Sequence, residues 1–207
     1  RSPSRGLGDV YKRQHFGLNL AMSMCKLTLD AIEGLEHCTF ATAMARNGVE
    51  FGLTVAGDPQ NWHLAPSPPV PSAVWFPGYG PADASLDLGD SAITETLGLG
   101  APATAAAPAL MAFVGGNAKL ALQYTAEAKR IYAARGVWPE LQIPSLDFEG
   151  IPMLLDVALV VSRRIRPAIN TGIAHKRAGI GQIGTGVSRA PLAAFASACE
   201  ALAARLD

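Results

Sequence analysis

Apolar side chains recur at helical spacing over residues 16–35, and Gly34 stands where such a helix would end. The pattern then changes over residues 38–55. Here β-branched and aromatic residues flank Asn47-Gly48, a dipeptide that favours a tight hairpin turn. The sequence therefore predicts an N-terminal helix followed by a β-hairpin. Arg46 and Asn47 would lie at the hairpin tip, where charged and polar residues often form only a solvated turn.

Proline dominates the next stretch. Five prolines over residues 60–79 preclude a regular helix, so we expect short edge strands and extended loop there. Asp90 or Ser91 can cap a helix that begins near Ala92, with Glu95 in its first turns. Capping alone would explain Asp90. We also expect Asp90 and Glu95 to lie close to the glycine-rich segment described below, because sites tend to gather at irregular segments next to helix starts.

The second half of the chain alternates predicted helices and strands. Two helices are expected over residues 99–114 and 118–134, broken at Gly115-Gly116. Further along, the sequence predicts a strand region over 141–148, a helix or buried strand over 156–162, a strand over 167–173 and a helix over 192–206. The expected fold is a single α+β domain with a mixed sheet, a β-hairpin and several packed helices.

Five glycines fall within residues 170–191. Glycine permits positive φ and close approach of a ligand to backbone N–H groups, which can form a concave anion site. His175 and Lys176 lie among these glycines and could add positive charge; the histidine could also exchange protons near neutral pH. The stretch therefore indicates a loop that cradles an anionic small molecule. The alternative is a tight buried connection in which the glycines only permit close packing, with His175 as a structural hydrogen-bonding residue.

Composition narrows the function classes. The chain has 17 basic and 17 acidic residues, so nothing favours nucleic acid or an anionic membrane as a partner. Cys25, Cys38 and Cys199 have no metal-ligand or disulfide spacing, which fits reduced cytoplasmic thiols, and no metal or cofactor is expected. The GxGxxG pattern at 179–184 is followed by a helix that contains Glu200, but the second strand that carries the acidic residue of a dinucleotide-binding unit is missing, which argues against nicotinamide binding.

Two segments need separate treatment. Residues 1–14 have no apolar periodicity, and we interpret them as a non-native or disordered leader, such as adaptor read-through, that precedes a fold over 15–207. Residues 96–118 carry no charge over about the length of a membrane helix, but glycines and prolines interrupt them. A buried helical region in a soluble, cytoplasmic protein is the interpretation we favour.

Four long strings carry a family resemblance: ATAMARNGVEFG (41–52), FPGYGPADASLDLGDSAITETLGLG (76–100), AAAPALMAFVGG (105–116) and INTGIAHKRAGIGQIGTGVSRAP (169–191). The chain resembles the C-terminal half of the YlbE-like family, domain of unknown function 1116. The resemblance implies an FdrA-like partner related to acyl-CoA synthetases. One branch of the family is similar to a subunit of oxamate carbamoyltransferase, which moves a carbamoyl group between oxamate and phosphate. Where a GTPxGID-like string is expected, this chain has GIPMLLD at 150–156, which leaves the substrate open.

Two hypotheses follow. In the first, the chain is part of an oligomeric carbamoyl- or acyl-transfer complex acting on a small anionic substrate. Its expected catalytic residues are His175, Lys176 and Glu95, and its expected substrate-binding residues are Arg46, Asn47, Asp90, Ser91, Asn170, Thr171, Gly172, Gly181, Gln182, Gly184 and Arg189. Fixed N–H donors and cations would stabilise the negative charge that develops on the carbonyl oxygen. In the second, the chain is a non-catalytic scaffold that docks the FdrA-like partner.

Overall fold

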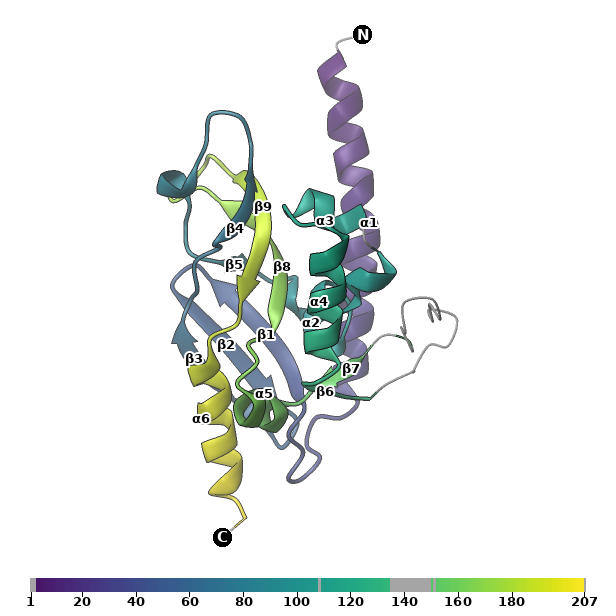
Figure 1. The fold of residues 1–207 in the computed structure, drawn as a ribbon. Coiled ribbons are helices and arrows are strands. Elements are labelled where there is room, and N and C mark those ends of the chain that lie inside the picture. The colour runs from purple at the N-terminus through teal and green to yellow at the C-terminus, as the bar shows by residue number, and fades with distance from the viewer. Residues whose placement is uncertain (1–2, 108, 135–149, 151, 207) are drawn as a thin grey trace.

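The fold begins with one long helix that stands beside the rest of the molecule (Figure 1). The computed structural model describes residues 3–107, 109–134, 150 and 152–206. Helix α1 covers Pro3–Asp30 and is followed by a turn in which Gly34 has φ 84°. The helix thus ends earlier than expected and also includes most of residues 1–14. That those residues are foreign to the protein stays a prediction.

The first sheet has strand order β3-β2-β1-β5. Strands β1 (Ala41–Asn47) and β2 (Glu50–Val55) form the predicted hairpin, and Gly48 in its turn has φ 84°. Strand β3 (Asp58–Pro66) is the expected edge strand, and β5 (Leu88–Gly89) pairs with the end of β1.

Helices cover both faces of this sheet. The ring of Phe195 stacks on Phe51 in a core cluster that includes Met44. Its neighbour Ala43 packs instead with Leu29 and Ile93. Because adjacent strand residues point to opposite faces, α6 (Leu192–Ala203) covers one face, and α1 with α2 (Ala92–Leu97) covers the other. Figure 1 shows α6 and α1 on different sides of these strands.

The second sheet corrects the expectation of a long glycine-rich loop. Residues 170–191 are mostly strand: β8 (Ala168–Ala174) and β9 (Gln182–Arg189) pair antiparallel, and β4 (Ser72–Trp75) pairs with β9. Only the turn between β8 and β9 is irregular. A third, two-stranded sheet pairs β6 (Tyr132–Ala134) with β7 (Met153–Leu155).

Two glycines of β9 permit close packing. A Cβ at Gly184 would lie 2.7 Å from the Val74 carbonyl oxygen, and one at Gly186 would lie 2.2 Å from that of Ser72. Gly179 and Gly181, with φ 87° and 88°, instead form the turn. Close packing, the alternative interpretation, therefore explains Gly184 and Gly186 in the strand. The access of glycine to positive φ matters only at Gly179 and Gly181 in the turn.

The remaining elements are short. They are η1 (Pro81–Asp83), η2 (Ala101–Ala106), α3 (Ala109–Phe113), α4 (Ala118–Ala128) and α5 (Val157–Arg163). The break at Gly115-Gly116 is confirmed. The first long helix expected before it is wrong, because η2, which begins at Ala101, and the short α3 take its place. The second is confirmed as α4 but ends at Ala128, since residues 132–134 pair with β7. The expected cap of α2 is wrong in detail, since the Ser91 side chain makes no capping bond.

The α+β class is confirmed. Its strands pair antiparallel in three separate sheets, where one mixed sheet was expected. The strand expected over 141–148 lies outside the described residues. Over the ranges that the structure describes, no helix combines the length and apolar character needed to cross a bilayer.

Leu154 is one of three non-glycine residues with positive φ in the described chain, at 64°. It occupies the position of the second glycine in GTPxGID, the string that the family resemblance leads us to expect here. A left-handed backbone at this position explains why glycine suits it. The leucine side chain packs against the cluster of α1 and α2, which offsets the backbone strain.

Candidate functional site

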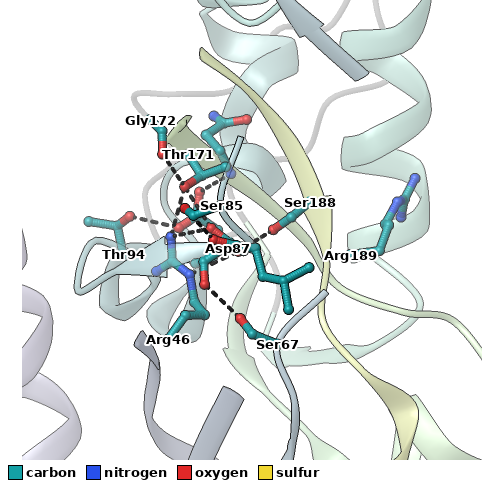
Figure 2. Close-up of polar contacts among 12 residues, drawn as sticks. Arg46, Ser67, Ser85, Asp87, Thr94, Thr171, Gly172, Ser188 and Arg189 are labelled. Atoms are coloured by element: carbon teal, nitrogen blue, oxygen red, sulfur yellow. Dashed lines mark hydrogen bonds and ion pairs between the residues drawn. The ribbon is translucent and has the colours of Figure 1, made fainter. Parts of the chain in front are cut away.

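A buried carboxylate, Asp87, holds together strands from both larger sheets (Figure 2). The side chain of Arg46 on β1 donates to it from Nε at 3.0 Å and from Nη2 at 3.3 Å. Thr171 Oγ1 on β8 donates at 2.8 Å and Ser188 Oγ on β9 at 2.5 Å. Four donors on one carboxylate compensate for its removal from water. Asp87 therefore fixes where β8 and β9 stand relative to the hairpin.

The guanidinium of Arg46 is fully buried in this ion pair. Its Nη2 also lies 3.1 Å from Thr171 Oγ1. Among the described residues no acceptor pairs with its Nη1, although that atom is buried. Arg46 is thus a fixed positive charge directly behind Thr171, not a solvated residue of the hairpin tip.

The second buried carboxyl, Glu95 on α2, is only 1% exposed. Its Oε1 accepts hydrogen bonds from the backbone N–H of Ala101 at 3.0 Å and of Asn170 at 3.2 Å. The Thr94 hydroxyl lies 3.1 Å from Oε2. Burial raises the pKa of the Glu95 carboxyl from 4.5 to about 7, although these hydrogen bonds and the charge of Arg46 act in the opposite direction. Both protonation states are therefore populated near neutral pH.

Gly100 makes this placement of Glu95 possible. It has φ 67°, and a Cβ there would lie 2.1 Å from Glu95 Oε1. The chain turns sharply at this glycine, so that the N–H of Ala101 points back at the carboxyl. Tyr132 adds a further contact, since its hydroxyl donates to the Glu95 backbone carbonyl at 2.5 Å. The carboxyl of Glu95 is thus held by the loop, and its backbone is held from the β6 side.

Glu95 lines a cavity of about 260 Å³. The polar part of its wall comes from α2, β8 and β9, and the apolar part comes from Leu18, Leu110 and Val114. The polar residues are Ser91, Thr94, Glu95, Asn170, Thr171, Gln182 and Thr185, with the backbone of Gly100 and Gly172. Leu18 and Leu110 are 39% and 47% exposed, so the cavity opens to solvent beside them.

The wall offers hydrogen-bonding groups and little charge. No lysine or arginine lines the cavity among the described residues. The side-chain oxygen of Asn170 is buried and has no donor from the described part of the chain. A small ligand with an amide N–H and no more than one negative charge would satisfy these groups.

Several residues expected in the site do meet in this cavity. They are Glu95, Ser91, Asn170, Thr171, Gly172 and Gln182, with Arg46 one hydrogen bond behind. Glu95 also contacts the glycine-rich segment, as expected, through Asn170. Their roles toward a ligand stay predictions.

His175 and Lys176 lie elsewhere, at the tip of the β8–β9 hairpin. The His175 ring packs edge-on against Tyr79 at 5.9 Å, and its Nδ1 accepts from the Arg177 N–H at 2.8 Å. Lys176 Nζ donates to the Ala82 carbonyl at 2.5 Å. Neither residue lines the cavity. The structure therefore gives these side chains local hydrogen-bonding roles at the turn.

The other expected residues are also outside the cavity. Asn47 Oδ1 accepts from the N–H groups of Val49 and Glu50, which is the turn role considered for the hairpin tip. Asp90 is exposed, and Gly181 lies in the hairpin turn. Gly184 pairs with Trp75 on the neighbouring strand β4, and Arg189 points away from Asp87 in Figure 2.

Sequence reasoning missed Asp87, Thr94 and Ser188 as site residues. Asp87 stands among turn-forming residues, so a solvated loop was the natural interpretation. Its burial depends on Arg46 and Ser188, which are 41 and 101 residues away in the chain. The one local signal for this burial is the alternation of side chains along the glycine-rich strands, which places Thr171 on the inward-facing side.

Comparison with known proteins shows similarity to one described family and to two curated proteins. Residues 7–91 match the family described as oxamate carbamoyltransferase subunit AllG. The protein of that name from Escherichia coli (strain K12) is 49% identical over 189 residues, which are 91% of this chain and 44% of that protein. Uncharacterized protein YahG of the same organism is 48% identical over 177 residues, 86% of this chain and 37% of that protein.

A solved structure is also similar. The crystal structure of a conserved protein of unknown function from Enterococcus faecalis V583 has a TM-score of 0.84 and 44% identity, and the match covers 91% of this chain and 44% of that one. The chain thus spans less than half the length of each of these relatives. The matched family segment includes Arg46 and Asp87 and ends at Ser91, four residues before Glu95.

Proposed function

We propose that this chain forms part of a carbamoyltransferase subunit and that the cavity beside Glu95 binds a small monoanionic amide of the oxamate type. The similarity to the AllG subunit supports the reaction class. The observation that carries the assignment to this cavity is the juxtaposition of Glu95, whose carboxyl has a pKa of about 7, with the unsatisfied Asn170 oxygen. An acid–base group and an acceptor for an amide N–H are what carbamoylation of an amide nitrogen needs.

The charge of the wall favours oxamate over a dianion. Among the described wall residues Glu95 is the sole ionisable one, and Arg46 supplies positive charge only from behind Thr171. A ligand with a single carboxylate can be held by hydroxyl and amide donors, whereas a doubly charged phosphate would lose its hydration without a cation in return. Asn170 Oδ1 would accept from the amide of oxamate, and Gln182 and protonated Glu95 would donate to its oxygens.

Glu95 would move the proton in the transfer. When the oxamate nitrogen attacks the carbonyl carbon of a carbamoyl donor such as carbamoyl phosphate, a C–N bond forms and the C–O bond to phosphate breaks. Glu95, which is protonated when oxamate binds, gives that proton to the phosphate, which leaves with the bonding electrons. The ionised Glu95 Oε2 then takes the proton that the nitrogen loses. Oε1 already accepts two backbone hydrogen bonds, which makes Oε2 the oxygen available for exchange. In the reverse direction Glu95 returns that proton to the leaving nitrogen.

Calorimetric titration with oxamate tests this proposal. Gln182 lines the cavity, while Gln123 on α4 is exposed and donates a hydrogen bond to Glu127, so the two form a matched pair. Gln182→Ala should weaken oxamate binding by about 2- to 10-fold, the range for one neutral hydrogen bond. Gln123→Ala should leave binding unchanged. Absence of saturable binding to the wild type, or equal weakening in both variants, would contradict the proposal.

A docking role is the second candidate. On α1 the side chains of Phe16, Leu20 and Leu27 are 64%, 59% and 74% exposed, and exposed apolar residues gathered on one helix favour an interface. An FdrA-like subunit is the partner that the family resemblance implies. The oxamate titration separates the two functions, because a pure scaffold predicts no binding by the wild type. Membership of an oligomeric complex belongs to both proposals.

A further inference from the structure

Four arginines converge on a groove that lies apart from the Glu95 cavity. The groove has a volume of about 350 Å³ and is lined by Glu127, Arg130, Arg164, Ile165, Arg166 and Arg189. Arg189 follows Ser188 on β9, and Figure 2 shows it pointing away from Asp87 while Ser188 points toward it. The groove is therefore separate from the proposed oxamate site.

Two of the four guanidinium groups are held in place before any ligand binds. Arg189 donates to Glu127 Oε2 at 2.5 Å and to the Arg166 carbonyl at 2.9 Å, and its guanidinium lies 4.9 Å from the centre of the Tyr124 ring. Arg166 donates to the carbonyls of Ala190 and Arg189 at 2.9 and 2.6 Å. Because these groups are already ordered, a ligand would not have to immobilise them.

The other two arginines contribute uncompensated charge. Arg130 and Arg164 are exposed and have no ion pair within the described residues. Arg164 ends α5 in the left-handed conformation with φ 53°, which turns the chain toward Arg166. Glu127 is the one acidic side chain among the described lining residues. The chain as a whole is neutral, so this excess of positive charge is a local feature.

We propose that the arginine groove binds a phosphate group, either as inorganic phosphate or as a phosphate monoester. The planar guanidinium forks match the tetrahedral oxygens of phosphate in pairs, and the preordered Arg166 and Arg189 provide a fixed platform. Arg130 and Arg164 would close on the remaining oxygens. The groove is open to solvent and larger than one phosphate, and Ile165 offers an apolar contact for the organic part of a monoester.

The test is calorimetric titration of the 207-residue chain at constant ionic strength. The probes are inorganic phosphate, glycerol 3-phosphate and, as a carboxylate comparison, acetate. Phosphate or the monoester should bind saturably and acetate should not. Tighter binding of glycerol 3-phosphate would identify a phosphorylated metabolite, and equal binding would identify phosphate itself. Absence of saturable binding for both phosphate probes, or equal binding of all three anions, would overturn the proposal.

Neighbouring arginines supply the matched control. Arg164→Asn keeps a residue that tolerates the left-handed backbone, and Arg130→Ala changes an exposed side chain, so both variants should fold. Each should weaken phosphate binding by about 10- to 100-fold, the worth of a hydrogen bond to a charged group. Arg163→Ala removes the same charge one residue away, outside the groove, and should change affinity by less than about 2-fold. Equal weakening by Arg163→Ala would show general charge attraction and overturn the site.

Discussion

At the residue scale, the protein has two buried carboxyl groups, Asp87 and Glu95, that differ in the hydrogen-bond donors around them. Asp87 accepts four hydrogen bonds from three side chains, two of them from the guanidinium of Arg46. Glu95 has two backbone donors and one hydroxyl, and burial raises its carboxyl pKa to about 7. The first arrangement suits a structural ion pair, and the second suits a group that takes and gives a proton.

The raised pKa of Glu95 has a consequence for stability. Because the pKa is higher in the folded state than in the unfolded chain, folding favours the protonated form, and its stabilising effect is lost as pH rises from 4.5 through about 7. Glu95→Gln should retain the Ala101 and Asn170 hydrogen bonds through its amide oxygen while removing the titration. The melting temperature of the wild type should fall relative to this variant between about pH 5 and pH 8.

Thermal unfolding across that pH range provides the measurement. A pKa change of this size corresponds to roughly 3 kcal/mol, or several degrees in a domain of this length. Glu50→Gln at the exposed start of β2 is the control, since it removes a carboxylate without burial. Parallel melting curves for wild type and Glu95→Gln at every pH would show that the carboxyl is ionised in the folded protein.

At the element scale, local patterns predicted the hairpin and the outer helices but not the glycine-rich segment. Asn47-Gly48 determines its own turn, so β1 and β2 follow from the sequence alone. The glycines of residues 170–191 were read as one loop because glycine is common to turns and to tightly packed strands. Gly184 and Gly186 belong to a packed strand because they pair with β4. That strand lies about 110 residues earlier, so the local pattern does not reveal it.

The packing of β4 on β9 can be tested with one methyl group. Gly186→Ala places a Cβ at 2.2 Å from the Ser72 carbonyl oxygen, so β4 has to move or detach. We expect a loss of about 1–3 kcal/mol in unfolding free energy, the usual cost of overpacking. Gly80→Ala is the matched control, since its Cβ would meet nothing within 4 Å and its φ is −159°. Equal stability of the two variants in urea unfolding would contradict the observed register.

At the scale of the whole molecule, the site belongs to no single element. Glu95 comes from α2, Asn170 from β8, Gln182 from β9 and Leu18 from α1, and they meet only when the two larger sheets are joined through Asp87. The sequence indicated Glu95, Asn170, Thr171 and Gln182 as chemically suitable residues. It also indicated His175 and Lys176, which lie at the hairpin tip, because proximity in sequence to the glycines could not show which strand face points inward.

The central claim is that protonated Glu95 binds an oxamate-like amide, and the pH dependence of affinity tests it most directly. Oxamate should be titrated into wild type and Glu95→Gln between about pH 5.5 and pH 9, a range over which oxamate stays a monoanion. The wild-type association constant should be constant below about pH 6 and fall about tenfold per unit above about pH 8, because the ionised carboxyl repels the ligand. Glu95→Gln, whose amide donates at every pH, should bind with constant affinity. The same decline in both proteins, or none in the wild type, would contradict the account.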